Sequence, residues 1–238
     1  MRTRFFFKPI IVFSFILVLI LLLPARIQAQ TFSYVSNGVA HTAAIATSGS
    51  LWAWGFNHDG QLGDGTGGFR WDDHRDSPTQ IGIGINWAAA SASRSHQHPY
   101  ANGGGYRTGC HTVAITTTGE LWAWGSNSFG QLGIATGGID NFSNIPVRVG
   151  VATEWKSVSA TWSGTAAVKT DGSLWVWRGT SRMRWAEGGG LYDDPNASWE
   201  TNIPIRVGTA RNIVSVSAGG GGVYTIATDA ILTFWRWR

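Results

Sequence analysis

Acidic residues and a histidine gather in one stretch of the sequence where they could do chemistry. Residues 70–76 read Arg-Trp-Asp-Asp-His-Arg-Asp, and paired carboxylates beside a histidine could bind a cation or carry out acid–base catalysis. Their spacing matches no calcium loop and the charges nearly cancel, which favours a polar loop between strands. In such a loop Trp71, beside Asp73 and His74, would suit a binding hot spot. A hydrolase that uses Asp72, Asp73 and His74 is the enzymatic alternative.

Histidines also occur in a glycine-rich stretch further along the chain. His96, His98 and Tyr100 could form a surface metal site, but no carboxylate accompanies them, so a solvated loop is favoured. An inserted loop on a rigid scaffold is a common place for partner binding, which makes these three residues binding candidates. The lone cysteine, Cys110, predicts no disulfide and is interpreted as a buried, inert thiol. No catalytic motif, metal site or cofactor is predicted.

A sequence repeat provides the elements that position these stretches. Four segments share one pattern: residues 41–55, 111–125, 164–178 and 222–236. Each has a compact apolar segment, a short turn and an alternating segment such as Leu-Trp-Ala-Trp, which predicts a β-hairpin. A further strand is expected at Pro78, Pro146 and Pro204, with the proline at its start where no ladder donor is lost. About four strands in a repeat of roughly sixty residues are typical of propeller blades.

Two details of the hairpins can be predicted from side-chain alternation and position. Leu121 and Ala123 are expected on one side of their strand, with Trp122 and Trp124 on the other. A histidine opens the first two hairpins, at residues 41 and 111. Two such ligands in separate blades are too few for a zinc site, so we interpret both as structural histidines that bond within their own blades.

The first two hairpins continue into a shared turn, Gly-x-Asn-x-x-Gly-Gln-Leu-Gly. Its residues are Gly55, Asn57, Gly60, Gln61, Leu62 and Gly63 in one copy and Gly125, Asn127, Gly130, Gln131, Leu132 and Gly133 in the other. With the preceding His-Thr-x-Ala-Ile and Leu-x-x-Trp segments, this turn resembles the regulator of chromosome condensation repeat, over roughly residues 34–238. The resemblance implies a β-propeller, usually of seven blades, in which these positions are blade architecture and mark no site.

The resemblance also implies a range of functions. The founder of that family is an exchange factor for a nuclear small GTPase, other members are interaction modules, and one secreted bacterial relative is an enzyme inhibitor. The repeat motif places no exchange residue in this chain. Guanine-nucleotide exchange is therefore expected by family analogy only, and this chain is interpreted as an exported, bacterial-type member.

The N-terminus reads as an export signal. Basic residues precede an apolar run over residues 10–23, Pro24 ends that run, and Ile27-Gln28-Ala29 offers a cleavage site. The run is short of the roughly 20 residues of a spanning helix, so we expect no stable membrane insertion after cleavage. An uncleaved membrane anchor is the alternative. Without the leader, basic and acidic residues are equal in number, which gives no support for nucleic-acid binding.

These observations predict an all-β chain of about three to four propeller blades, a partial or open propeller, after a signal peptide. The expected divisions are a signal peptide over residues 1–29 and a repeat domain over residues 30–238, with units of approximately 34–77, 78–145, 146–203 and 204–238. The third copy breaks after Trp177, where arginine stands in place of the motif's glycine. A reading-frame error or decayed gene and a genuinely degenerate blade both explain the break.

The favoured function is an exported, secreted or periplasmic, non-enzymatic scaffold. It would bind a protein or cell-envelope component, of unknown identity, through loops on one face. The alternatives are an inhibitor of a secreted enzyme and the hydrolase described above. Open ends of a partial propeller expose unpaired blade edges, so self-association is also expected.

Overall fold

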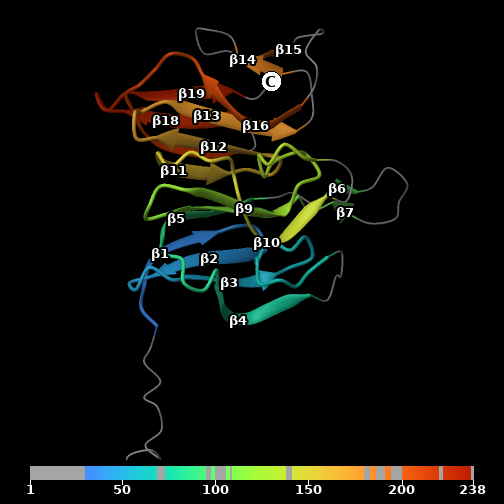
Figure 1. Ribbon diagram of the computed structural model, residues 1–238. Coiled ribbons are helices and arrows are strands. Elements are labelled where there is room, and N and C mark those ends of the chain that lie inside the picture. The colour runs from blue at the N-terminus through green and yellow to red at the C-terminus, as the bar shows by residue number, and fades with distance from the viewer. Residues whose placement is uncertain are drawn as a thin grey trace, which may run out of the picture. The chain divides into compact units, whose positions relative to one another are not determined.

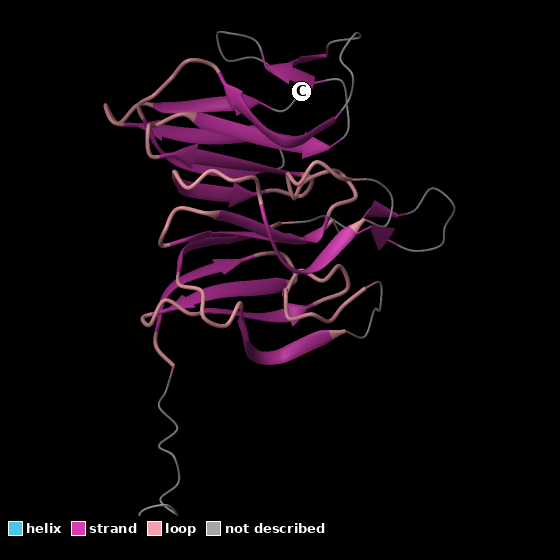
Figure 2. Ribbon diagram, in the orientation of Figure 1, coloured by secondary structure: helices cyan, strands magenta, loops and turns pink. Residues whose placement is uncertain are grey.

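The computed structural model describes part of the chain in detail. The described residues are 30–68, 73–94, 98–99, 106–107, 109–137, 141–179, 183–185, 191–193, 200–219 and 222–236. The chain forms two units, Met1–Thr31 and Phe32–Arg238, and the strands of the described residues belong to the second. All regular elements within the described ranges are strands (Figure 2), and none of these ranges contains a helix that could cross a membrane. The predicted signal peptide lies outside the described residues.

The second unit is built from four antiparallel sheets in chain order (Figure 1). Blade 1 pairs β1 (Phe32–Asn37), β2 (His41–Ala46), β3 (Leu51–Phe56) and β4 (His74–Ile81) in that order. Blade 2 pairs β5 (Trp87–Ala92), β8 (His111–Thr116), β9 (Leu121–Ser126) and β10 (Phe142–Arg148). Blade 3 pairs β11 (Trp155–Ala160), β12 (Gly164–Lys169), β13 (Leu174–Gly179) and β16 (Glu200–Val207). Blade 4 has three strands, β17 (Ile213–Gly219), β18 (Gly222–Ala227) and β19 (Leu232–Arg236).

Two short hairpins interrupt this regular pattern. β6 (His98–Pro99) pairs with β7 (Tyr106–Arg107) between two strands of blade 2. β14 (Met183–Trp185) pairs with β15 (Leu191–Asp193) between two strands of blade 3. Despite the break in its repeat after Trp177, blade 3 therefore has a fourth strand and the same strand order as blades 1 and 2.

The predicted hairpins are confirmed in every blade. In blade 2, Val113 lies opposite Ala123 and Ile115 opposite Leu121, with a turn in which Gly119 has a φ of 79°. Such a left-handed conformation favours glycine because it has no Cβ. In blade 4 the same turn position is held by Ala230, at a φ of 63°.

The strand that contains the proline differs from expectation in two ways. It is the outermost strand of the blade that precedes it, so the sheets are offset from the sequence units by one strand. In β4, β10 and β16 the proline also lies in the middle of the strand, and the register shifts beside it. A proline is tolerated there because the outermost strand is a sheet edge and the shift removes the ladder position that would need its donor.

The hydrophobic core lies between consecutive blades, so both faces of an inner blade are buried. Leu121 and Ala123 belong to the cluster shared with blade 3, while Trp124 belongs to the cluster shared with blade 1. This confirms the predicted alternation. At the first two junctions a tryptophan of the inner strand meets one of the third strand edge-on, with ring centroids 6.0 Å apart for Trp87 and Trp124 and 6.2 Å apart for Trp155 and Trp177.

Candidate functional site

The strand order places the chain's long connections on one edge of the blades. The first and third strands of an antiparallel blade run in the same direction, so the connections that follow them leave from the same edge. These are residues 57–73, 93–110, 127–141 and 180–199, and β6–β7 and β14–β15 lie within two of them. The opposite edge carries the tight hairpin turns and the short connections between blades. We call these two sides the loop-bearing edge and the turn edge.

The site residues proposed from the sequence that the structure describes fall on the loop-bearing edge. Asp73 and His74 are described, and His98 lies in β6. Trp71, His96 and Tyr100 lie outside the described residues. The topology therefore brings the connection of blade 1 and the insertion of blade 2 to one edge, although they are remote in sequence.

The repeated turn begins the blade 1 and blade 2 connections and is held by its own polar side chains. The side-chain oxygen of Asn57 accepts a hydrogen bond from the amide of Leu62 at 3.1 Å, and Asn127 accepts one from Leu132 at the same distance. Gly63 has a φ of 77°, and a Cβ there would lie 2.6 Å from Nε1 of Trp124. The motif's asparagines therefore hold the turn together, and this glycine leaves room for the close approach of the next blade.

In blades 1 and 2 the same turn also bonds the blade to the one that follows. The carbonyl oxygen of Gln61 accepts bonds from Thr112 Oγ1 at 2.7 Å and from Trp124 Nε1 at 3.0 Å. At the next junction, Gln131 accepts from Thr165 Oγ1 and Trp177 Nε1 at 3.0 and 2.8 Å. The role of these threonines was not predicted, although each of the first three hairpins begins with His-Thr or Gly-Thr, and this repetition is a signal for it.

The two repeated histidines are structural, but they bond between blades and not within them. His41 Nε2 lies 2.9 Å from Thr112 Oγ1, and His111 Nε2 lies 3.0 Å from Thr165 Oγ1. The expectation of bonding within a blade is wrong because the ring lies at the junction and reaches the threonine of the following blade. Burial lowers the pKa of His41 to about 4 and that of His111 to about 3, so both rings are neutral near pH 7.

The junction between blades 3 and 4 lacks this arrangement. The sequence after Trp177 has no Gln-bearing turn, and Val223 stands where the earlier blades have threonine. Trp235, the counterpart of Trp124, donates instead to Thr225 Oγ1 of its own blade, at 2.9 Å. A junction can therefore form without the repeated turn.

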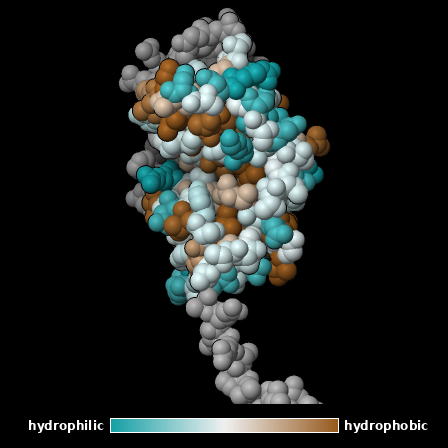
Figure 3. Space-filling view, turned by 90° about the vertical axis from the view of Figure 1, so that its left-hand side faces the viewer, coloured by the Kyte–Doolittle hydropathy of each residue, from teal (hydrophilic) through white to brown (hydrophobic). Residues whose placement is uncertain are grey.

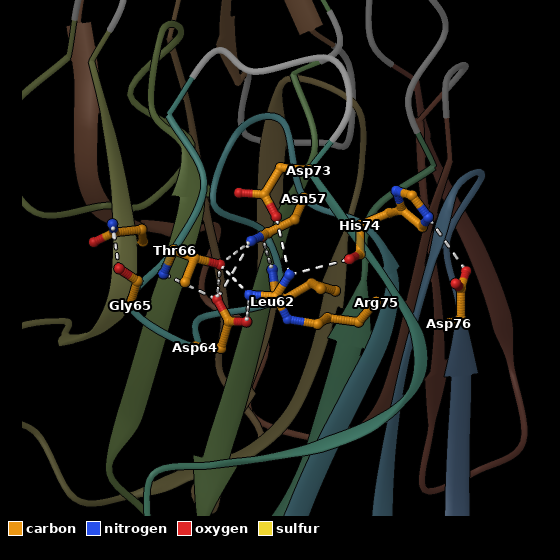
Figure 4. Close-up of polar contacts among 10 residues, drawn as sticks. Asn57, Leu62, Asp64, Gly65, Thr66, Asp73, His74, Arg75 and Asp76 are labelled. Carbon is orange, nitrogen blue, oxygen red and sulfur yellow. Dashed lines mark hydrogen bonds and ion pairs between the residues drawn. The ribbon is translucent and has the colours of Figure 1, made fainter.

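In the mixed-charge stretch of blade 1, the guanidinium of Arg75 bonds several neighbouring polar side chains (Figure 4). Its guanidinium lies 2.8 Å from Asp64 Oδ2 and 3.1 Å from Asp73 Oδ1, and it also donates to Thr66 Oγ1 at 2.7 Å. Burial alone would raise the pKa of Asp64, but the hydrogen bonds from Thr66 and the charge of Arg75 hold it below its ordinary value. Asp73 is thus engaged by an arginine, which supports the prediction of a structural polar loop.

His74 and Asp76 lie beside this cluster of polar side chains around Arg75, and both face solvent. His74 Nε2 is 3.4 Å from Asp76 Oδ1, and their side chains are 55% and 91% exposed. In Figure 4 this pair points away from Arg75. Within the described residues no three side chains of histidine, cysteine, aspartate or glutamate are grouped to hold a metal ion.

A buried carboxylate ties the blade 1 turn to the insertion of blade 2. Asp59 Oδ2 accepts a bond from the amide of Cys110 at 2.9 Å, and Asp59 Oδ1 lies 2.8 Å from Nδ1 of the buried His58. The second copy has Phe129 at this position, which packs edge-on against Trp162 in the corresponding connection of blade 3, at 5.2 Å. Each turn thus anchors the base of a connection in the next blade, by charge in one case and by an aromatic contact in the other.

The comparisons with known proteins agree with this architecture. Two models described as the regulator of chromosome condensation (RCC1) repeat match residues 33–61 with 109–131, and residues 48–97. The Ultraviolet-B receptor UVR8 of Arabidopsis thaliana is 32% identical over 164 residues, 67% of this chain and 33% of that protein. The RCC1 domain-containing protein RUG3, mitochondrial, of the same plant is 27% identical over 222 residues, 90% of this chain and 44% of that protein.

A solved structure extends the likeness to the fold. Prp20p of Saccharomyces cerevisiae superposes with a TM-score of 0.65 and 20% sequence identity, over 87% of this chain and 46% of that chain. This chain therefore spans less than half the length of these relatives. The repeated turn, the blade order and these matches together show that the chain belongs to the regulator of chromosome condensation (RCC1) repeat family, with propeller-type blades.

Proposed function

We propose that this chain is an exported, non-enzymatic scaffold that binds a protein or cell-envelope partner through its loop-bearing edge. The observation that carries the proposal is the asymmetry of the blades. All four long connections, including both inserted hairpins, leave from one edge, and the turn edge has only tight turns and short connections. Connections of this kind on a rigid β-scaffold commonly carry recognition.

The rigidity of the scaffold supports the same conclusion. The carbonyls of Gln61 and Gln131 each accept two bonds from the following blade, and Asp59 holds the base of the blade 2 insertion. A loop held at its base loses less conformational entropy when it binds, which favours affinity. In addition, the structure of Prp20p was described with its binding properties to Gsp1p and histones, which makes protein binding a reasonable use of this fold.

The polar groups on this edge support binding in preference to turnover. Asp73 is paired with Arg75, so it is engaged in a structural contact that a general base would have to give up. His74 and Asp76 are exposed, so a partner's polar groups can reach them. Export of the chain rests on the leader sequence described above, and N-terminal sequencing of the native protein would test it, with Gln30 expected as the first residue.

Site-specific photo-crosslinking in the source cells tests which edge is used. A photoreactive amino acid replaces His74 or Asp76 on the loop-bearing edge, and Ile83 or Val151 on the turn edge. Ile83 and Val151 are 86% and 89% exposed, so both edges offer accessible positions. The proposal expects one protein adduct of the same mass from both loop-edge positions and none from the turn-edge positions. Equal labelling of the two edges, or adducts from the turn edge alone, would refute it.

A further inference from the structure

Two aliphatic side chains project from the turn edge. Ile83 and Val151 are 86% and 89% exposed, more than any other large hydrophobic residue in the described ranges. They occupy the same position in successive blade connections, directly after Gly82 and Gly150, whose φ values are 62° and 63°. Figure 3 views the molecule from this edge and shows apolar side chains set among hydrophilic ones across the blades. The repeat therefore presents an aliphatic tip on each of two neighbouring connections.

An arginine bonds the backbone of the later tips. Arg148 Nη2 donates to the carbonyl of Val151 at 3.2 Å. Arg206 Nη2 donates in the same way to the carbonyl of Thr209, the equivalent tip between blades 3 and 4, also at 3.2 Å. In the first connection, residues 82–86 carry no charge at all. The tips are thus accompanied by guanidinium groups or by uncharged residues, and no carboxylate bonds them.

The charged groups around these tips leave an excess of positive charge. Three acidic side chains of blades 2 and 3 lie at the turn edge, and each is paired with a base. The pairs are Glu120 with Arg148 at 3.1 Å, Glu154 with Lys169 at 3.2 Å, and Asp171 with Arg211. Two further bases, Lys156 at the start of β11 and Arg206 at the end of β16, form no ion pair with another described residue. This part of the edge therefore suits a partner that carries negative charge.

We propose that the turn edge rests on a membrane surface that contains anionic phospholipids. Ile83 and Val151 enter the boundary between headgroups and acyl chains, and Lys156 and Arg206 face lipid phosphates. Aliphatic side chains gain from burial at that boundary, and each nearby lysine or arginine adds attraction to anionic lipid. Because only two side chains enter the bilayer, the contact is peripheral and reversible.

The form of this surface favours a bilayer over a protein partner. Protein binding energy is concentrated in side chains that lie together at the centre of a patch, where surrounding contacts exclude water. Ile83 and Val151 lie on separate connections, and at 86% and 89% exposed neither has close neighbours to form such a patch. A bilayer requires only that both tips project from the same edge. The contact would also leave the loop-bearing edge pointing away from the membrane, so it is independent of the function proposed for that edge.

Cosedimentation with lipid vesicles tests this proposal. The chain from Gln30 onward is used, because the apolar leader would itself bind lipid and Phe32–Arg238 form one compact unit. Vesicles of phosphatidylcholine and phosphatidylglycerol in equal amounts should bind wild-type protein roughly 20-fold more tightly than vesicles of phosphatidylcholine alone. A double variant, Lys156→Gln with Arg206→Gln, should lose this preference. A second, Ile83→Ser with Val151→Ser, should bind the mixed vesicles at least roughly tenfold more weakly.

Two other exposed isoleucines provide a matched control. Ile145 and Ile203 are 54% and 49% exposed, but they lie within the outermost strands of blades 2 and 3 and not at the turn edge. Ile145→Ser with Ile203→Ser should leave vesicle binding unchanged, and circular dichroism would verify that each variant folds. No wild-type binding at millimolar lipid, wild-type binding by the Ile83 and Val151 variant, or an equal loss in the control would overturn the proposal. A protein adduct from Ile83 or Val151 in the crosslinking experiment above would overturn it as well.

Discussion

Acidification should destabilise this protein because two histidines are buried without charge at the blade junctions. His41 and His111 are 3% and 0% exposed, and their pKa values fall from 6.5 to about 4 and about 3. Between these values and pH 6.5 the unfolded chain binds two more protons than the folded chain. Stability is therefore complete above pH 6.5 and is lost as the pH falls below it.

The size of the effect follows from the width of that pH interval. Each pH unit below 6.5 lowers the free energy of unfolding by about 1.4 kcal/mol per buried histidine, as long as the ring stays neutral in the folded chain. At pH 5 this amounts to about 2 kcal/mol for each of His41 and His111, or about 4 kcal/mol together. Asp64 acts at lower pH, because its depressed pKa lies below the ordinary 3.8 and its contribution is lost only around and beneath that value.

Urea unfolding followed by tryptophan fluorescence at pH 7.5 and pH 5 measures this loss directly. We expect the free energy of unfolding of the wild type to fall by about 4 kcal/mol, and that of His111→Gln by about half as much. His74→Gln is the matched control, because this histidine is 55% exposed and lies outside the blade junctions. A wild-type difference below about 1 kcal/mol, or the full difference in His111→Gln, would refute the reasoning.

Two substitutions test the packing and bonding of the junctions. A Cβ at Gly133 would lie 2.6 Å from Nε1 of Trp177, whereas one at Gly150, which also has a positive φ, meets nothing within 4 Å. Gly133→Ala should therefore lower the thermal midpoint of unfolding much more than Gly150→Ala does. The cost of Gly150→Ala is only the backbone strain, about 1 kcal/mol. Equal shifts of the two midpoints would contradict the role of the close approach to Trp177. Thr165→Val removes the contacts of this hydroxyl with the carbonyl of Gln131 and with His111 Nε2, and it should cost about 1–3 kcal/mol in urea unfolding. A cost near zero would show that Thr165 does not stabilise the junction.

Local signals in the sequence were enough to predict the blades. The alternation of Leu121 to Trp124 and the glycine at the hairpin turn specify a hairpin without reference to the rest of the chain. The repeated turn could likewise be read as architecture, because Asn57 bonds a residue five positions away and within the same motif. Hydrogen bonds between residues only a few positions apart can be predicted from the spacing of a motif, which a single sequence shows.

The candidate site was predicted only in outline. The loops were recognised from their composition, and the strand order then placed them on one edge. Arg75 was interpreted as one charge among several in residues 70–76. In the structure it pairs with Asp64, which lies outside that stretch. The sequence could not reveal this pairing because Asp64 lies within the long connection before β4, and its distance from Arg75 depends on how that connection folds.

The sequence by itself determined the all-β repeats, the strands of each blade and the family to which they belong, because hairpin alternation and turn glycines act within a few residues. Only the tertiary structure decided which strand closes each blade and what the repeated histidines bond. His41 and Thr112 are 71 residues apart, and they meet because consecutive blades bury their apolar faces against each other.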